Sequence, residues 1–139
     1  MIKPSQRLKE IKALDGYIDS QVKQLEKIES QALKVTSTIK ADRVNGGRQT
    51  KRDDLYIELI GLKEDIQKSI AKAVTQKREF MAMIDRVEDL ESQTLLFQYY
   101  IEKVDIWQIC EQWEFSRKTF YQKIKKANQQ LDEILTRNQ

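Results

Sequence analysis

The sequence predicts an all-α protein in which a long antiparallel helical hairpin is followed by a C-terminal helix-turn-helix. Apolar residues recur at steps of three and four through nearly the whole chain, which is the spacing of one buried helical face. Charged residues make up 34% of the 139 residues, with only four glycines and one proline, and this composition suits helices. The run Asn45-Gly46-Gly47 separates two long periodic segments, as a loop between helices does.

The first periodic segment predicts a long helix between Pro4-Ser5 and a loop at 42–50. Proline is suited to the first turn of a helix, and Ser5 is a candidate N-cap. The alternation is close to a heptad and continues for about five heptads, as in a coiled coil. The inward positions that we predict are Leu8, Ile11, Leu14, Ile18, Val22, Leu25, Ile28, Ala32, Val35 and Ile39.

The second periodic segment predicts a helix of matched length that begins near Lys51 to Asp54, where the carboxylates of Asp53 and Asp54 favour a helix N-terminus. Two such helices joined by a short loop should fold back as an antiparallel hairpin. The polar run at 88–93 marks a boundary, so we predict a coiled-coil hairpin domain at 1–91 and a helix-turn-helix unit at 92–139. The inward positions of the second helix are Leu55, Leu59, Leu62, Ile66, Ile70, Ala73, Lys77, Phe80, Ile84 and Val87.

The C-terminal segment from Leu95 to Leu135 predicts a short helix followed by a helix-turn-helix. Its apolar pattern breaks between Trp113 and Phe120, and Ser116 stands where a helix needs an N-cap acceptor. The spacing of the two helices around this break is that of a helix-turn-helix. The apolar residues that mark its buried faces are Leu96, Tyr99, Tyr100, Ile106, Ile109, Cys110, Trp113, Phe120, Ile124, Ala127, Leu131, Ile134 and Leu135.

The second helix of this motif has a basic outward face, since no acidic residue stands between Arg117 and Ala127. A helix that enters the major groove of DNA by its N-terminal end has this layout. The alternative is an amphipathic helix with a solvated basic face, and the helix-turn-helix spacing favours DNA binding over it. The candidate DNA-binding residues are Arg117, Lys118, Thr119, Tyr121, Gln122, Lys125, Lys126, Lys103 and Lys123. Of these, Lys103, Lys123 and Lys126 are expected at phosphates, and Thr119 either reaches a phosphate or stabilises the first turn of the helix.

Composition argues against an enzyme, because a chain without histidine has no imidazole base and no histidine metal ligand. We therefore expect no catalytic residues, no cofactor and no metal. The single cysteine, Cys110, is expected to be a buried structural thiol. No apolar run approaches the ~20 residues needed to span a bilayer, so we expect a cytoplasmic protein without a membrane partner. The net charge of +3 permits nucleic-acid binding without requiring it.

The C-terminal segment resembles the DNA-binding region 4 of bacterial sigma factors between Leu96 and Leu131. The matching runs are Leu96-Phe97-Gln98-Tyr99-Tyr100, Asp105-Ile106-Trp107-Gln108-Ile109-Cys110 and Ser116-Arg117-Lys118-Thr119-Phe120-Tyr121-Gln122, with Ala127 where that pattern keeps an alanine. Three residues depart from it: Cys110 replaces an alanine, Trp113 replaces a leucine, and Phe115 takes a turn position often held by glycine.

Over nearly its full length the chain resembles the sigma-like late transcriptional regulators of Gram-positive phages, of the RinA, ArpU and LtrC type. The resemblance includes the opening Leu8-Lys9-Glu10-Ile11-Lys12-Ala13-Leu14-Asp15, the Asp42-Arg43-Val44 run before the glycines, and the helix from Leu62 to Ile84. It implies a phage or prophage regulator that binds promoter DNA in the bacterial cytoplasm and activates late genes for packaging and lysis.

The hairpin leaves a second interpretation open. Two helices alone bury little apolar area per residue, so either the C-terminal unit packs on their end or a second copy completes a four-helix bundle. A homodimer through these helices would suit an operator with two-fold symmetry, and a coiled-coil spacer without a ligand of its own is the alternative. Alternatively, the protein is a helical interaction protein that binds host RNA polymerase or another protein through the hairpin.

Overall fold

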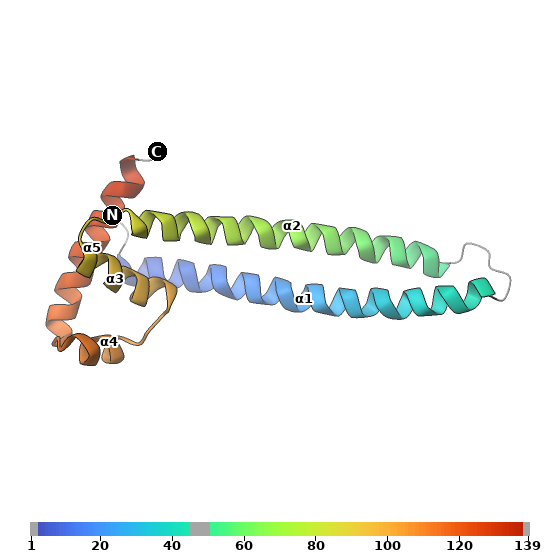
Figure 1. The fold of residues 1–139 in the computed structure, drawn as a ribbon, viewed down its shortest axis with the longest axis horizontal. Coiled ribbons are helices and arrows are strands. Elements are labelled where there is room, and N and C mark those ends of the chain that lie inside the picture. The colour runs from blue at the N-terminus through green and yellow to red at the C-terminus, as the bar shows by residue number, and fades with distance from the viewer. Residues whose placement is uncertain (1–2, 45–50, 138–139) are drawn as a thin grey trace. The chain divides into compact units, whose positions relative to one another are not determined.

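Every regular element is a helix within residues 3–44 and 51–137, which the computed structural model describes (Figure 1). The predicted fold class is confirmed, since two long helices form a hairpin and a helix-turn-helix follows it. In chain order the elements are α1 (Pro4–Val44), α2 (Lys51–Asp85), α3 (Leu90–Leu96), the π-helix η1 (Phe97–Ile101), α4 (Ile106–Trp113) and α5 (Arg117–Arg137).

The ends of α1 differ from those predicted. The Lys3 carbonyl accepts the Arg7 N–H at 3.0 Å, so Lys3 caps the helix, Pro4 is its first residue, and the N-cap predicted for Ser5 is wrong. Proline is favoured at this position because the first amides of a helix have no intrahelical partner. At the other end, α1 continues to Val44, because nothing before Asn45 breaks a helix, and residues 42–44 of the predicted loop are therefore helical. The rest of that loop, 45–50, lies outside the described residues.

The chain divides into two compact units: a hairpin unit, Gly16–Val74, and a core unit, Met1–Asp15 with Thr75–Gln139. These bounds differ from the domains predicted at 1–91 and 92–139. The reason is that Ile11 of α1, Ile84 of α2 and Val87, which lies just after the end of α2, belong to the same apolar core as the C-terminal helices. Compactness therefore assigns the first residues of α1 and the last residues of α2 to the core unit.

The seam of the hairpin unit follows a heptad, and this corrects three of the predicted inward positions. Leu55 and Leu62 are 44% and 48% exposed, whereas their neighbours Tyr56 and Lys63 are half-buried. On α1, Gln21 is half-buried in place of the exposed Val22. A period of 3.5 residues, unlike one of 3.6, keeps the same heptad positions on the seam along the whole helix.

Ion pairs link the two antiparallel helices, which lie side by side (Figure 1). In the hairpin unit, Lys63 Nζ lies 3.8 Å from Glu29 Oε1, because the lysine stem runs along the seam and carries its charge out to the edge. In the core unit, Lys77 is likewise half-buried, as predicted, and its ammonium donates to Asp15.

Aromatic side chains connect helices within the largely aliphatic core of the core unit. Tyr100 and Phe120 are fully buried. The Phe80 ring meets Tyr100 edge to face at a centroid distance of 5.7 Å, and Tyr99 meets Phe120 in the same way at 5.8 Å. Such pairs stabilise packing beyond the area that they bury. They join α2 to η1 and η1 to α5, so the C-terminal helix is positioned by a core that the hairpin helices help to build.

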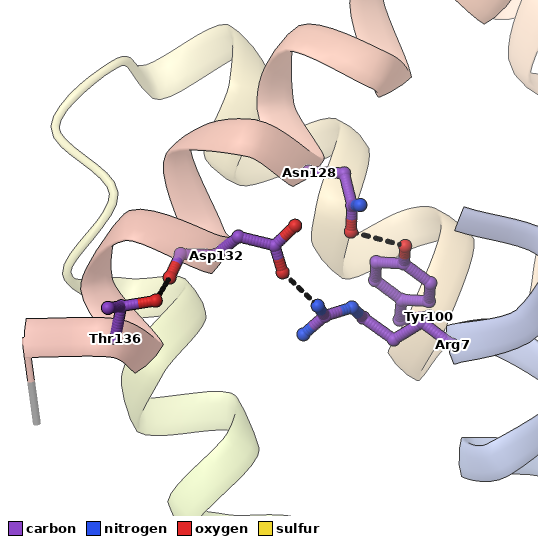
Figure 2. A network of polar contacts seen from close by, with 5 residues as sticks. All are labelled: Arg7, Tyr100, Asn128, Asp132 and Thr136. Atoms are coloured by element: carbon purple, nitrogen blue, oxygen red, sulfur yellow. Dashed lines mark hydrogen bonds and ion pairs between the residues drawn. The ribbon is translucent and has the colours of Figure 1, made fainter. Parts of the chain in front are cut away.

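A buried polar network lies where α1, η1 and α5 meet (Figure 2). The Arg7 guanidinium forms an ion pair with the Asp132 carboxylate, and the Tyr100 hydroxyl donates to Asn128 Oδ1 at 2.8 Å. Burial raises the pKa of Tyr100 well above its ordinary value, which keeps the hydroxyl a donor. The Thr136 hydroxyl donates to the Asp132 carbonyl at 2.8 Å. The Arg7–Asp132 ion pair anchors the first turn of α1 against α5, and the Tyr100–Asn128 hydrogen bond anchors η1 against it.

Candidate nucleic-acid interface

The turn between α4 and α5 is a Schellman motif. The Phe115 N–H donates to the Cys110 carbonyl at 2.9 Å and the Glu114 N–H donates to the Glu111 carbonyl at 3.4 Å. Glu114 is left-handed, with φ 59° and ψ 38°. The residue that takes the glycine-favouring conformation is therefore Glu114, not Phe115 as the sequence comparison indicates. Phe115 instead packs against the core, which is the apolar contact that accompanies this motif.

The start of α5 is capped by Ser116, which confirms the predicted N-cap. Its Oγ accepts the Thr119 N–H at 3.1 Å and donates to Thr119 Oγ1 at 2.9 Å. The cap satisfies one of the four amides that a helix N-terminus leaves without an intrahelical partner. The Thr119 hydroxyl, predicted as a DNA contact, lies within this cap, so the structure gives it a part in holding the first turn.

The two faces of α5 separate as predicted. Phe120, Ile124, Ala127, Leu131 and Ile134 are buried. The outward face carries the exposed residues Arg117, Lys118, Tyr121, Gln122, Lys125 and Lys126. Five of the nine predicted DNA contacts therefore lie on one exposed surface, and Lys126 lies beside them. The five are Arg117, Lys118, Tyr121, Gln122 and Lys125. No carboxylate from α5 itself lies among them, because its first acidic residue is Asp132.

Two of the predicted DNA contacts lie elsewhere, because distant carboxylates hold their ammonium groups. Lys123 Nζ donates to Glu91 Oε1 at 2.6 Å and lies 5.1 Å from the centre of the Phe115 ring. Lys103 Nζ donates to Asp15 Oδ2 at 2.5 Å. The structure thus uses both lysines to connect α3 and the segment before α4 to other helices of the core unit.

Asp15 is a nearly buried carboxylate held by two lysines. Lys103 donates to one oxygen, and Lys77 Nζ donates to Oδ1 at 2.7 Å. Burial by itself would raise the pKa of Asp15, but the hydrogen bonds from Lys103 and Lys77, with their charges, lower it below its ordinary value of 3.8. A carboxyl group whose pKa is lower in the folded state stabilises that state above its unfolded pKa.

We expect Asp15→Asn to destabilise the protein by about 1–3 kcal/mol at pH 7, which is the scale of hydrogen bonds to charged groups. The difference from the parent should be constant above about pH 5, shrink as the pH falls through 3.8, and disappear below the folded-state pKa of Asp15. Urea unfolding at a series of pH values measures it. A difference that grows on acidification would contradict this account.

The position of α4 depends on Gln98, which the sequence marked only as part of a helix. Gln98 is buried, its Oε1 accepts the Trp113 Nε1–H at 2.9 Å, and its Nε2 donates to Gln112 Oε1 at 3.0 Å. These bonds connect η1 to the last turn of α4. The apolar pattern of the sequence could not predict them, because they are hydrogen bonds between one side-chain amide and two residues of α4.

Cys110 is buried, as predicted.

The structure also brings residues to the basic surface that sequence reasoning missed. An open hollow of about 380 Å³ lies beside α5, with Lys3, Pro4 and Ser5 on one side and Tyr121 and Lys125 on the other. Lys3 and Lys125 are far apart in the sequence, and only the packing of α1 on α5 places them at the same hollow. No local signal in the sequence points to Lys3.

Residues 3–44 and 51–137 contain no group of three or more cysteine, aspartate or glutamate side chains that could hold a metal ion. In the same ranges, no helix combines the length and the apolar character needed to cross a membrane.

The fold and its basic surface define an all-α protein with a C-terminal helix-turn-helix. The chain belongs to the family described as "Protein of unknown function (DUF1492)", which matches residues 33–132 and so includes α2, α4 and most of α5. No curated protein and no solved structure matches the chain.

Proposed function

We propose that this protein is a sequence-specific DNA-binding transcription regulator of a phage or prophage that activates late genes through a sigma-region-4-like helix-turn-helix. The observation that supports it best is the exposed basic and amide surface at the start of α5, directly after the α4 turn. The resemblance to late regulators of Gram-positive phages supports the biological setting. On this proposal it acts in the bacterial cytoplasm, without cofactor and without catalysis.

The residues of the surface suit both readout of bases and attraction to phosphates. Arg117 and Lys118, at the N-terminal end of α5, can donate to O6 and N7 of guanine, and Gln122 can pair with adenine. Lys125 and Lys126 lie further along the exposed side of the helix and are suited to phosphates, which contribute affinity and salt dependence. Because Lys103 and Lys123 are paired with carboxylates, we assign them to holding the core unit together.

Replacing Arg117 by alanine should cost about 1–3 kcal/mol of binding to the preferred duplex and relax the preference at one base pair. The side chain is exposed, so the fold should be unaffected. Fluorescence anisotropy against genomic fragments and random duplexes, at two salt concentrations, measures both quantities. Arg78→Ala, which removes an exposed arginine from α2, is the matched control. If Arg117→Ala bound preferred and random duplexes as the parent does, the proposed function would be wrong.

A second candidate function is protein interaction through the hairpin unit, either with a second copy or with host RNA polymerase. It is favoured by Leu33 and Ile57, which are 70% and 62% exposed. The Lys63–Glu29 ion pair shows which residues of the antiparallel helices lie opposite each other, and Leu33 and Ile57 both lie on its loop side at a similar level along the hairpin. Exposed branched apolar side chains on both helices are typical of a surface that another protein covers.

We expect the double variant Leu33→Gln/Ile57→Gln to remain folded and to lose self-association. Both side chains are exposed, so their replacement removes no core contact, and a surface change of this kind alters stability by only about 0.5 kcal/mol. Light scattering at tens of micromolar (about the range where a weak dimer forms) compares it with the parent, and Val22→Gln is the control. A parent that is strictly monomeric there would exclude the homodimer and leave polymerase as the candidate partner.

A further inference from the structure

We propose that the N-terminal end of α1 is a second DNA contact, in which Lys3 and Lys125 together hold one phosphate of the DNA backbone at the hollow beside α5. This inference rests on the proposed function, because it extends the same surface. It adds to that surface an element more than a hundred positions away in the sequence.

The backbone of Lys3 is held in place relative to α5. Its carbonyl accepts the first hydrogen bond of α1, from the Arg7 N–H at 3.0 Å. The Arg7 side chain in turn forms the ion pair with Asp132 of α5 (Figure 2). Asp132 lies about two helical turns beyond Lys125. The ion pair therefore fixes the start of α1 against the same helix that presents Lys125, and both lysines remain exposed.

The chemistry of the hollow suits a DNA backbone. Its rim carries the cations of Lys3 and Lys125, and its lining includes the apolar surfaces of Pro4, Tyr99 and Ile124. No carboxylate is found among its described lining residues. In a DNA backbone each phosphate anion is joined to weakly polar deoxyribose rings. The phosphate would meet the two lysines, and the deoxyribose would meet the apolar lining of the hollow. The hydroxyls of Ser5 and Tyr121 are further donors for phosphate oxygens.

The location of the hollow fits the orientation of a recognition helix. Tyr121 and Lys125 belong both to the hollow and to the exposed face of α5, so DNA on that face passes the hollow. Contacts to phosphates on either side of the groove fix the register of such a helix without reading sequence. Lys3 would therefore contribute to affinity and to salt dependence, and would leave the order of preferred sequences unchanged.

The test compares the full-length parent with Lys3→Gln, Lys125→Gln and the double variant, on the parent's preferred duplex, from low to moderate salt. Lys3→Gln should reduce the slope of log K against log salt by up to about 0.9, the value for one whole phosphate contact, and weaken binding several-fold near 0.1 M salt. The double variant should lose less than the two single losses combined, because both lysines hold one phosphate. Lys9→Gln, an exposed lysine of α1 outside the hollow, is the control and should bind as the parent does.

The outcomes separate the two proposals. If the parent binds with Arg117-dependent preference but Lys3→Gln keeps the parental slope and affinity, the inference is wrong and the proposed function stands. If the parent prefers no duplex at any salt concentration, both fail. A second copy of the chain could occupy the hollow instead of DNA, and sedimentation without DNA tests this alternative. If the parent were a dimer and Lys3→Gln a monomer, the hollow would be a self-association site and the inference would be wrong.

Discussion

Replacement of Arg7 by alanine is expected to destabilise the core unit by about 3–5 kcal/mol, which is the cost of breaking a buried ion pair. The two side chains are only 6% and 18% exposed. Without the guanidinium, the largely buried Asp132 carboxylate loses its ion-pair partner, and its Oδ2 already has no hydrogen-bond partner in the parent. The N-terminal end of α1 would also lose its polar anchor on α5.

The double variant Arg7→Ala/Asp132→Ala tests whether the cost comes from the orphaned charge. It removes both members of the pair, so it should be more stable than Arg7→Ala alone, even though it removes more atoms. Urea unfolding of the parent, both single variants and the double variant measures the difference. If Asp132→Ala lowered the free energy of unfolding of Arg7→Ala as much as it lowers that of the parent, the two residues would act independently. The ion pair would then not be the cause of the destabilisation.

Replacing Phe120 by alanine should have an effect of similar size, about 3–5 kcal/mol, which is typical of a buried phenylalanine. The ring is fully buried and meets Tyr99 edge to face at 5.8 Å. It is also the residue through which the first turns of α5 enter the core. The cavity left by the ring would loosen these turns, so DNA binding should weaken although Phe120 itself is too buried to reach DNA.

Gln122→Ala is the matched control for Phe120→Ala, because Gln122 lies two residues further along α5 on its exposed face. Its effect on stability should stay within about 0.5 kcal/mol, whereas its effect on DNA preference should be large if Gln122 reads adenine. Thermal unfolding and anisotropy, applied to both variants, separate the two roles. Equal destabilisation by the two substitutions would contradict the division of α5 into a buried and an exposed face.

The elements that the sequence determined are those with a local physical cause. The period of apolar residues specifies which face of α5 is buried, since Phe120, Ile124 and Ala127 follow one another at steps of three and four. The Ser116 cap depends on amides within three residues of it. The same local reasoning misses the seam of the hairpin by one position at Leu55 and Leu62. Periods of 3.5 and 3.6 residues diverge so slowly along a helix that an apolar pattern does not distinguish neighbouring positions as the centre of the buried face.

Contacts between distant elements were decided only by the tertiary structure. Lys103 meets Asp15 across 88 positions, and Arg7 meets Asp132 across 125. The local sequence is of the same kind for a lysine that pairs with a remote carboxylate and for one that remains exposed. The sequence therefore could not distinguish Lys103 and Lys123 from Lys125. The sequence thus determined the helices, their buried faces and the basic face of α5. Contacts of α1 and α3 with the C-terminal segments decided which cations stay on the surface and placed Lys3 beside Lys125, because register and crossing between helices depend on side chains far apart in the chain.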